Sequence, residues 1–274
     1  MKRISKKGFL TFFLFIVSLW NLSSQEIIIA YEDKEQPPYY LGVGDVIPKD
    51  YPGIAVEMIL SIEQYLEPLK ITLVRLPWSR CLLYLKEGKV DGIFNASFNA
   101  ERLLYGWYPT ENGLHSGTID SSKRITNISY SLYKLKDSTI DWDGSHFQNL
   151  GDSELGAPLG YSIVNDLIKM KIGIYQFQST KNGFEMLMRR RIPGIVVQDV
   201  TGDSILLQNY DRFMSIEKDV PEVISKDYYL MLSNLFVREN SDLAQKIWET
   251  LAFVRTNHMA DLFQKYSETM NLKE

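Results

Sequence analysis

The sequence predicts an α/β protein built from βαβ units, with mostly parallel strands. Short runs rich in β-branched residues alternate with segments whose apolar residues recur at helical spacing. This alternation is typical of parallel sheets covered by helices. The chain has 274 residues, of which 45% are hydrophobic, so it is long and apolar enough for one large domain or two smaller ones.

The first half of the chain opens this alternation with a β-branched strand over 26–31. A loop follows over 33–50, because Pro and Gly interrupt that stretch repeatedly. Pro52 and Gly53 then open a helix whose apolar positions recur at helical spacing. The remaining segments carry the start and stop signals of their class: a strand at 70–76, a helix at 78–86 ended by Gly88, a strand at 90–94 and a helix from 100 capped by Asn99.

The second half repeats the pattern with shorter segments. Strands are expected where apolar runs end in Gly or polar residues. Helices are expected where a polar residue precedes apolar residues that recur at helical spacing. These segments are strands at 155–159, 172–177, 194–198 and 228–236, and helices at 162–170, 179–190, 200–208 and 241–266. A long polar stretch over 115–153, with a strand-like run at 128–135, is expected to lead from one lobe to the other. The chain would return over 214–228.

Residues 1–24 have the layout of a secretory signal peptide. Four basic residues precede a 13-residue apolar run over 8–20, and small polar residues follow at 23 and 24. A membrane span needs about 20 apolar residues, so an uncleaved signal anchor is the less favoured alternative. We expect cleavage near Ser24, release into the periplasm, and no stable membrane insertion afterwards.

The charge and cysteine content exclude several classes of partner. The whole chain has a net charge of −4, and removing the four basic residues of 1–24 lowers it to −8, so no nucleic-acid partner is expected. The single Cys81 allows neither an internal disulfide nor a cysteine-rich zinc site, and no Cys near Ser24 can carry a lipid. With only three His, we expect no metal site and no cofactor.

From position 78 onward the chain resembles a known family. In the first half, a helix ends in a Leu-x-x-Gly-Lys-x-Asp turn, and a strand, a loop and a Glu-Arg helix start follow it. The second half contributes Gly183 to Leu187, Val197-Gln198-Asp199 and the terminal segment from Tyr229. The order and spacing of these motifs resemble the extracellular solute-binding proteins of family 3, the polar amino-acid type. The likeness covers nearly all of the chain after the signal segment.

The resemblance implies two Rossmann-like α/β lobes joined by crossover strands, the periplasmic-binding-protein-like II fold. Lobe 1 would comprise 25–117 plus 222–274, and lobe 2 would comprise 118–221. The ligand would lie in the cleft between the lobes, which close on it like a hinged trap. The family also implies a monomer that delivers its ligand to the membrane subunits of an ABC importer.

Arg102 matches the family arginine that pairs with the ligand's α-carboxylate, because a guanidinium can bind both carboxylate oxygens. The alternative is a solvated helix arginine. Ser97, in the loop before Arg102, would bind the same carboxylate. That loop is one residue shorter here than in the usual family pattern, which leaves its contacts open.

Two residues of the second half are expected to contact the ligand by the same resemblance. Asp199 matches the acid that holds the α-ammonium, with a helix N-cap as the equally weighted alternative. Ser162 lies where family members carry a hydroxyl before a helix, so it would accept an anion or cap that helix. Tyr161 replaces a residue that is often small, and we expect it to narrow or reshape the cleft.

Aromatic residues are expected to wall the cleft. Trp78 begins a helix that faces the ligand in the family, and Tyr40 and Tyr39 follow Pro37-Pro38 in the first loop. Aromatic rings bury apolar ligand surface and can hold a cation. The alternative for each ring is ordinary core packing.

The sequence therefore predicts a periplasmic, non-enzymatic protein that captures a small polar ligand, an amino acid or a related compound. Two alternatives remain. One is a periplasmic enzyme on the same fold, similar to cyclohexadienyl dehydratases, which would need a general acid or base beside the reacting carbon. The other is a sensing module that passes its ligand signal to a receptor in trans.

Overall fold

The computed structural model describes residues 25–271, with side chains described to residue 267. The predicted signal segment 1–24 lies outside the described residues. Twelve strands are present, with these bounds: β1 Glu26–Glu32, β2 Lys70–Leu76, β3 Gly92–Ser97, β4 Gly106–Trp107, β5 Thr126–Leu135, β6 Asp141–Trp142, β7 Phe147–Gln148, β8 Leu155–Pro158, β9 Ile174–Phe177, β10 Gly194–Gln198, β11 Ile216–Lys218 and β12 Ile224–Ser233.

Helices alternate with these strands, as the spacing of apolar residues predicts. Their bounds are α1 Ile54–Tyr65, α2 Trp78–Lys86, α3 Ser162–Lys169, α4 Thr180–Met188, α5 Asp199–Gln208, α6 Tyr210–Phe213, α7 Asn234–Glu239 and α8 Ser241–Asn271, with 3-10 turns η1 Ala100–Leu104 and η2 Ser121–Lys123. None of the helices described between 25 and 271 is long and apolar enough to cross a bilayer.

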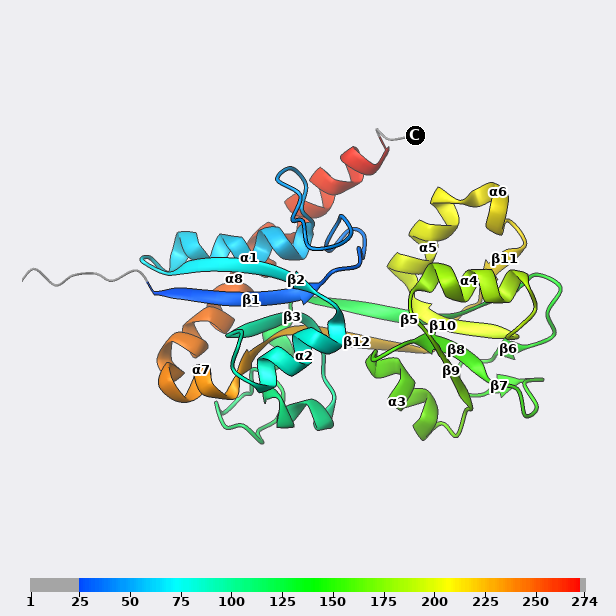
Figure 1. Cartoon of the computed structure of the whole chain (residues 1–274), viewed down its shortest axis with the longest axis horizontal. Helices are drawn as coiled ribbons and strands as arrows, with labels where there is room; N and C mark the ends of the chain where they lie inside the picture. The colour runs from blue at the N-terminus through cyan, green and yellow to red at the C-terminus, as the bar shows by residue number, and fades with distance from the viewer. Residues whose placement is uncertain (1–24, 272–274) are drawn as a thin grey trace, which may run out of the picture.

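One mixed sheet runs through the whole molecule in the order β2-β1-β3-β12-β5-β10-β8-β9, with β4 beside β12 and β11 beside β5 (Figure 1). At each end of the sheet the strands are parallel, as in β2-β1-β3 and β10-β8-β9. In the middle, β12 pairs antiparallel with β3 and β5, and β5 with β10. The predicted α/β class with mixed sheets is confirmed. Every antiparallel pair of the main sheet includes β5 or β12, and β6 and β7 form a separate antiparallel pair.

The two crossover strands join the lobes. Lobe 1 carries β1–β4, α1, α2, α7 and α8, and lobe 2 carries α3–α6 and β6–β11, with β5 and β12 between them (Figure 1). β5 and β12 each have 10 residues, which corresponds to roughly 33 Å of extended chain. They are therefore long enough to pass through both lobes. The predicted boundaries at 117/118 and 221/222 lie in the loops before β5 and β12, and they stay predictions.

The structure corrects two predicted strands. The strand expected at 90–94 is β3, which starts at Gly92 and continues to Ser97, because its later residues pair with β12. The strand expected at 228–236 starts at Ile224 and ends at Ser233. Ser233 stops it by capping α7, since its hydroxyl accepts a hydrogen bond from the Phe236 N–H at 3.0 Å.

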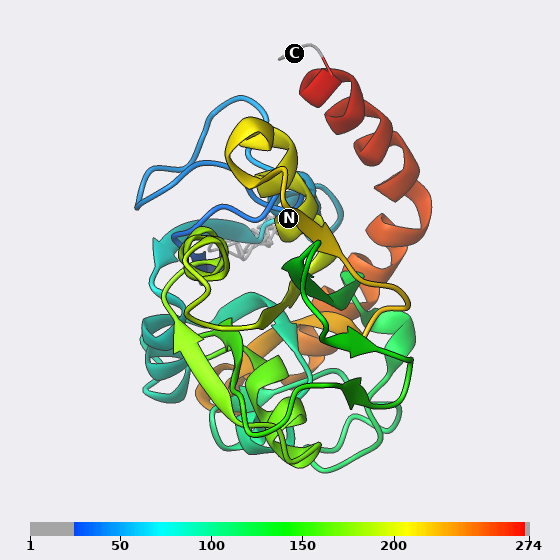
Figure 2. The same ribbon diagram turned by 90° about the vertical axis from the view of Figure 1, so that its right-hand side faces the viewer.

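The loop over 33–50 is fixed from two sides. Buried Arg75 at the end of β2 donates to the carbonyls of Leu41, Gly42 and Val46 at 3.1, 2.6 and 3.1 Å. On the other side, α8 runs along the molecule and its last turns lie beside the loop (Figure 2). The Tyr266 hydroxyl there accepts the Gly53 N–H at 2.7 Å. Both contacts position the segment that enters the cleft.

Candidate functional site

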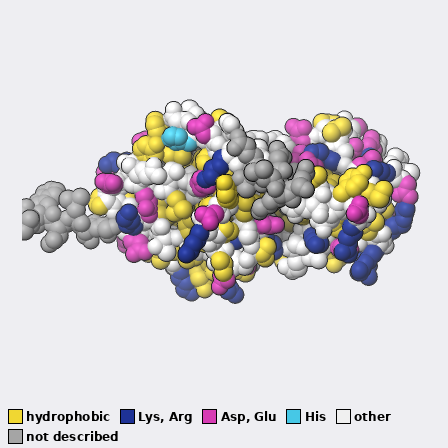
Figure 3. All heavy atoms as spheres, turned by 90° about the horizontal axis from the view of Figure 1, so that it is seen from above, with side chains coloured by type: hydrophobic (Ala, Val, Ile, Leu, Met, Phe, Trp, Pro, Cys, Tyr) yellow, Lys and Arg dark blue, Asp and Glu magenta, His cyan; other side chains and the backbone are white. Residues whose placement is uncertain are grey.

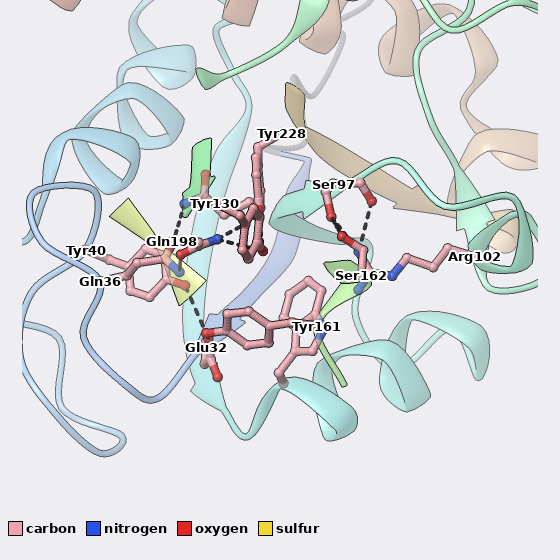
Figure 4. A pocket seen from close by; sticks show the side chains of 12 residues that line it. Glu32, Gln36, Tyr40, Ser97, Arg102, Tyr130, Tyr161, Ser162, Gln198 and Tyr228 are labelled. Atoms are coloured by element: carbon pink, nitrogen blue, oxygen red, sulfur yellow. Dashed lines mark hydrogen bonds between the residues drawn. The ribbon is translucent and has the colours of Figure 1, made fainter. Parts of the chain in front are cut away.

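A small cavity lies between the lobes, where strands of both lobes end (Figure 4). Its free volume is about 20 Å³, which is room for roughly one or two water molecules. Residues of both lobes line it, and this lining is polar and aromatic: Glu32, Gln36, Tyr40, Trp78, Asn95, Ser97, Arg102, Tyr130, Tyr161, Ser162, Gln198 and Tyr228. With the lobes in this position, the side chains of the protein itself fill most of the site.

Arg102 forms one wall of the cavity. Its helical turn η1 is capped by Asn99, whose side chain accepts the Glu101 N–H at 3.0 Å. The residue is only 5% exposed, and its guanidinium carbon lies 5.2 Å from the centre of the Trp78 ring. Nη1 donates to the Ser97 carbonyl and hydroxyl at 2.9 and 3.3 Å.

The contacts of Arg102 leave its charge without an acidic partner. Its remaining hydrogen bond goes to the Gly160 carbonyl at 3.3 Å, and no carboxylate of the described residues forms an ion pair with it. A buried cation is expensive unless an anion accompanies it. Arg102 is therefore suited to an anionic group of a ligand.

Hydroxyl groups from both lobes lie beside Arg102. The Ser97 and Ser162 oxygens are 2.6 Å apart across the cleft, and Lys226 donates to the Ser162 hydroxyl at 2.9 Å. Burial lowers the pKa of Lys226, although its ion pair with Asp166 opposes this effect. Ser162 is the first residue of α3, and Tyr161 is its N-cap. A carboxylate here would meet a guanidinium, two hydroxyls and a helix N-terminus.

Glu32 lies on the lobe 1 side of the cavity, at the end of β1. The residue is 3% exposed, and its Oε2 accepts hydrogen bonds from the hydroxyls of Tyr161 and Tyr40 at 2.6 and 3.3 Å. Its Oε1 is buried without a hydrogen-bond partner and forms only a long ion pair, at 3.7 Å, with Nζ of the half-exposed Lys34. Burial raises the pKa of this carboxyl.

Asn95 adds a second unpartnered acceptor to the same cavity. Its Oδ1 is buried with no hydrogen-bond partner, while its Nδ2 donates to Gln36 at 3.3 Å. The residue has a left-handed backbone, with φ of 57°, which Asn tolerates better than most residues. Buried acceptors without donors are costly. Two of them in one cavity indicate that the missing partner is an N–H or O–H group.

A neutral network lies between these two ends (Figure 4). Gln198 Nε2 donates to the hydroxyls of Tyr228 and Tyr130 at 2.6 and 3.2 Å, and Gln36 donates to the Gln198 carbonyl oxygen. Burial raises the pKa of Tyr228 to about 12 and that of Tyr130 also. Both hydroxyls stay protonated at neutral pH, so this part of the site carries no charge.

Of the residues predicted from the sequence, the cavity brings together Arg102, Ser97, Ser162, Tyr161, Trp78 and Tyr40. Tyr39 lies apart, buried in the lobe 1 core with its ring edge-on to Phe263 at 6.3 Å. Tyr39 belongs to the turn over 37–39, whereas Tyr40, which follows the turn and bridges to Gln36, lines the cavity.

Asp199 does not line the cavity. It is the first residue of α5, without a capping hydrogen bond from its side chain, so the predicted cap is wrong by one position. Burial raises its pKa, and its nearest basic group is Lys218 Nζ at 3.9 Å. Gln198 occupies the cleft instead, because the end of β10 turns that side chain inward.

The sequence reasoning missed half of the lining, namely Glu32, Gln36, Asn95, Tyr130, Gln198 and Tyr228. One signal was available for Glu32, which is a carboxylate directly after the apolar run of the first parallel strand. Ligands of open α/β sheets bind outside the carboxyl ends of such strands. The tyrosines gave no signal, because in sequence they are part of ordinary alternating strands.

Neither a known family nor a curated protein sequence matches the chain. Solved structures do match in fold. One is a histidine kinase sensor domain with similarity to periplasmic binding proteins, with a TM-score of 0.67, 16% identity, and coverage of 89% of this chain and 96% of that one. Another is an ancestral arginine-binding protein bound to arginine, with a TM-score of 0.64, 15% identity and coverage of 88% and 97%.

A third similar structure is the GluR0 ligand-binding core from Nostoc punctiforme in complex with L-glutamate. Its TM-score is 0.64 at 14% identity, with coverage of 88% of this chain and 98% of that one. At such identities the likeness concerns the fold. The chain has the two-lobed α/β fold of periplasmic-binding-protein-like domains.

Proposed function

We propose that this chain is a ligand-binding protein that captures a small molecule with one anionic and one cationic group, an amino acid or a related compound. The observation that carries the proposal is the charge arrangement of the cavity. Arg102 is a buried cation without an acidic partner among the described residues, and across the cavity Glu32 Oε1 and Asn95 Oδ1 are buried without a hydrogen-bond donor. A zwitterion would satisfy both walls at once.

Binding would require the lobes to separate and close again. In the present arrangement direct bonds join them, such as Tyr161 to Glu32 and Ser97 to Ser162. A ligand would replace these bonds with its own. It would stabilise the closed state by the difference between the free energy of its contacts and that of the bonds it replaces. Recognition and a shift between open and closed populations are sufficient, so we propose no catalytic step.

We further propose that the protein acts outside the inner membrane, as a periplasmic monomer, with 1–24 as the export signal. Among similar folds, an ancestral arginine-binding protein binds arginine and the GluR0 core binds L-glutamate, which supports an amino-acid ligand. Delivery to an ABC importer is the output that we favour. The sensor-domain neighbour supports the alternative, in which the closed form signals to a receptor.

Thermal-shift screening of the purified protein against amino acids, amines and small carboxylic acids tests the proposal. A ligand that binds only the folded state raises the melting temperature in proportion to the logarithm of its concentration. Calorimetry with the best hit then compares two variants. Arg102→Ala should lose most of the affinity, whereas Arg80→Ala, an exposed arginine on α2, should retain it. Equal affinity in the two variants would contradict the assignment.

A further inference from the structure

Tyr161 lies between two cavities of very different size. The inner cavity holds the candidate site and has a free volume of about 20 Å³. A second cavity of about 430 Å³ lies outside it, between the loop over 33–50 and helices α4 and α5 of lobe 2. Tyr161 lines both. Other walls of the outer cavity include Lys34, Pro37, Gln178, Thr201 and Gln208.

The tyrosine ring is held in this position from both ends. Its hydroxyl donates to Glu32 Oε2 at 2.6 Å, so the ring reaches across the cleft to lobe 1. Its backbone N–H donates to the Pro158 carbonyl, and its carbonyl accepts the Val164 N–H, each at 3.2 Å. Gly160 before it adopts φ of 78°, a turn that directs the residue toward the cleft.

The hydroxyl of Tyr161 also occupies an acceptor that the ligand needs. Glu32 has one oxygen without a hydrogen-bond partner, and its other oxygen is taken by Tyr161 and Tyr40. A long cationic side chain reaching past Glu32 toward the outer cavity would have to cross the plane of the ring. A compact ligand between Arg102 and Glu32 would not.

We propose that Tyr161 sets the size limit of the ligand, so that the chain selects a compact zwitterion and rejects amino acids with long side chains. The inference rests on the proposed function and names the ligand class within it. Removal of the ring would join the inner cavity to the outer one. Long basic amino acids would then place their side chains in the outer cavity, which Tyr161 now separates from the site.

The experiment measures the dissociation constants of a graded series by calorimetry: glycine, alanine, 2,4-diaminobutanoate, ornithine, lysine and arginine. With the wild-type protein, the affinity for arginine should be weaker than that for the best compact member by about tenfold or more, the range that added methylenes produce in a closed pocket. In Tyr161→Thr, the affinities for arginine and lysine should rise relative to those for the compact members by a similar factor.

Two further variants show whether the ring of Tyr161, rather than its hydroxyl or the loss of any tyrosine, limits the size of the ligand. Tyr161→Phe keeps the ring and should keep the wild-type order of affinities. Tyr210→Thr changes a tyrosine that is 65% exposed and should leave every affinity unchanged. If the wild-type protein binds arginine as tightly as alanine, or if Tyr161→Thr leaves the order unchanged, the size limit is wrong. If no member binds to either protein and no other zwitterion does, the proposed function fails, and the size limit with it.

Discussion

At the scale of single residues, the site depends on charges buried before any ligand arrives. Arg102 was predictable because its motif singles it out, and Ser97 and Ser162 followed from the same pattern. Gln198 was not predictable, since a shift of one residue at the start of α5 exchanges it with Asp199. Side-chain direction at a strand end depends on the turn that follows, and the residue pattern does not define that turn to within one position.

Glu32→Gln should make the protein more stable at neutral pH and a weaker binder. Burial raises the pKa of Glu32 above its ordinary value of 4.5, with Lys34 opposing and Asp33 reinforcing this effect. The cost of burying the charge is absent well below pH 4.5, grows as the pH rises from there to the raised pKa, and is fully present above it. Gln keeps an acceptor for Tyr161 without that cost.

Urea unfolding of the two proteins at pH 4 and pH 7.5 measures this effect. At pH 7.5 the free energy of unfolding of the variant should exceed that of the wild type by on the order of 1 kcal/mol, and at pH 4 the two should be nearly equal. The ligand affinity of the variant should be lower. A gain of the same size at both pH values would show that the charge of Glu32 is not its cause.

At the scale of elements, the long helix α8 supports the site from outside. Tyr266 near its end donates to Glu57 Oε1 at 2.6 Å and accepts the Gly53 N–H. Gly53, with φ of 120°, lies against the Tyr39 and Tyr40 backbone, where a Cβ would come within 2.4 Å. The helix thus fixes the turn that directs Tyr40 into the cavity.

Tyr266→Phe should destabilise the protein by about 1–2 kcal/mol, because the Gly53 N–H and the Glu57 carboxylate lose a shared partner. The melting temperature should fall accordingly. Tyr65→Phe is the matched control, because its hydroxyl shares one exposed hydrogen bond, at 3.0 Å, with His258 among the described residues. Equal effects of the two substitutions would remove Tyr266 from this supporting role.

Most elements were predictable because their periodicity and caps agree, as in β2, α2 and β10, whose predicted and observed bounds coincide. The end of β3 was not, since the strand expected at 90–94 continues to Ser97. β3 carries Asn and Ser inside a fully buried strand, and a polar composition usually indicates a loop. Only its place between β1 and β12 in the sheet makes it a strand.

At the scale of the whole molecule, the two-lobed arrangement followed from the resemblance, and the alternation alone would have fitted one domain equally well. Acidic and basic side chains are mixed over the face seen in Figure 3, without a basic patch there.

Joining the lobes covalently should block ligand entry. The Ser97 and Ser162 oxygens are 2.6 Å apart, so Ser97→Cys combined with Ser162→Cys places two thiols within reach of a disulfide. Cys81 is fully buried and will not compete. The oxidised variant should bind ligand far more weakly than the same variant after reduction. Equal affinity in both redox states would contradict entry through an opening cleft.

The most direct measurement of the central claim is a crystal structure with the tightest ligand from the screen. We predict density for one molecule between the lobes, with its anionic group about 2.7–3.1 Å from the Arg102 guanidinium and its cationic group at similar distance from Glu32 and Asn95. A ligand bound only in the outer cavity, or one whose anionic group does not reach Arg102, would contradict the account.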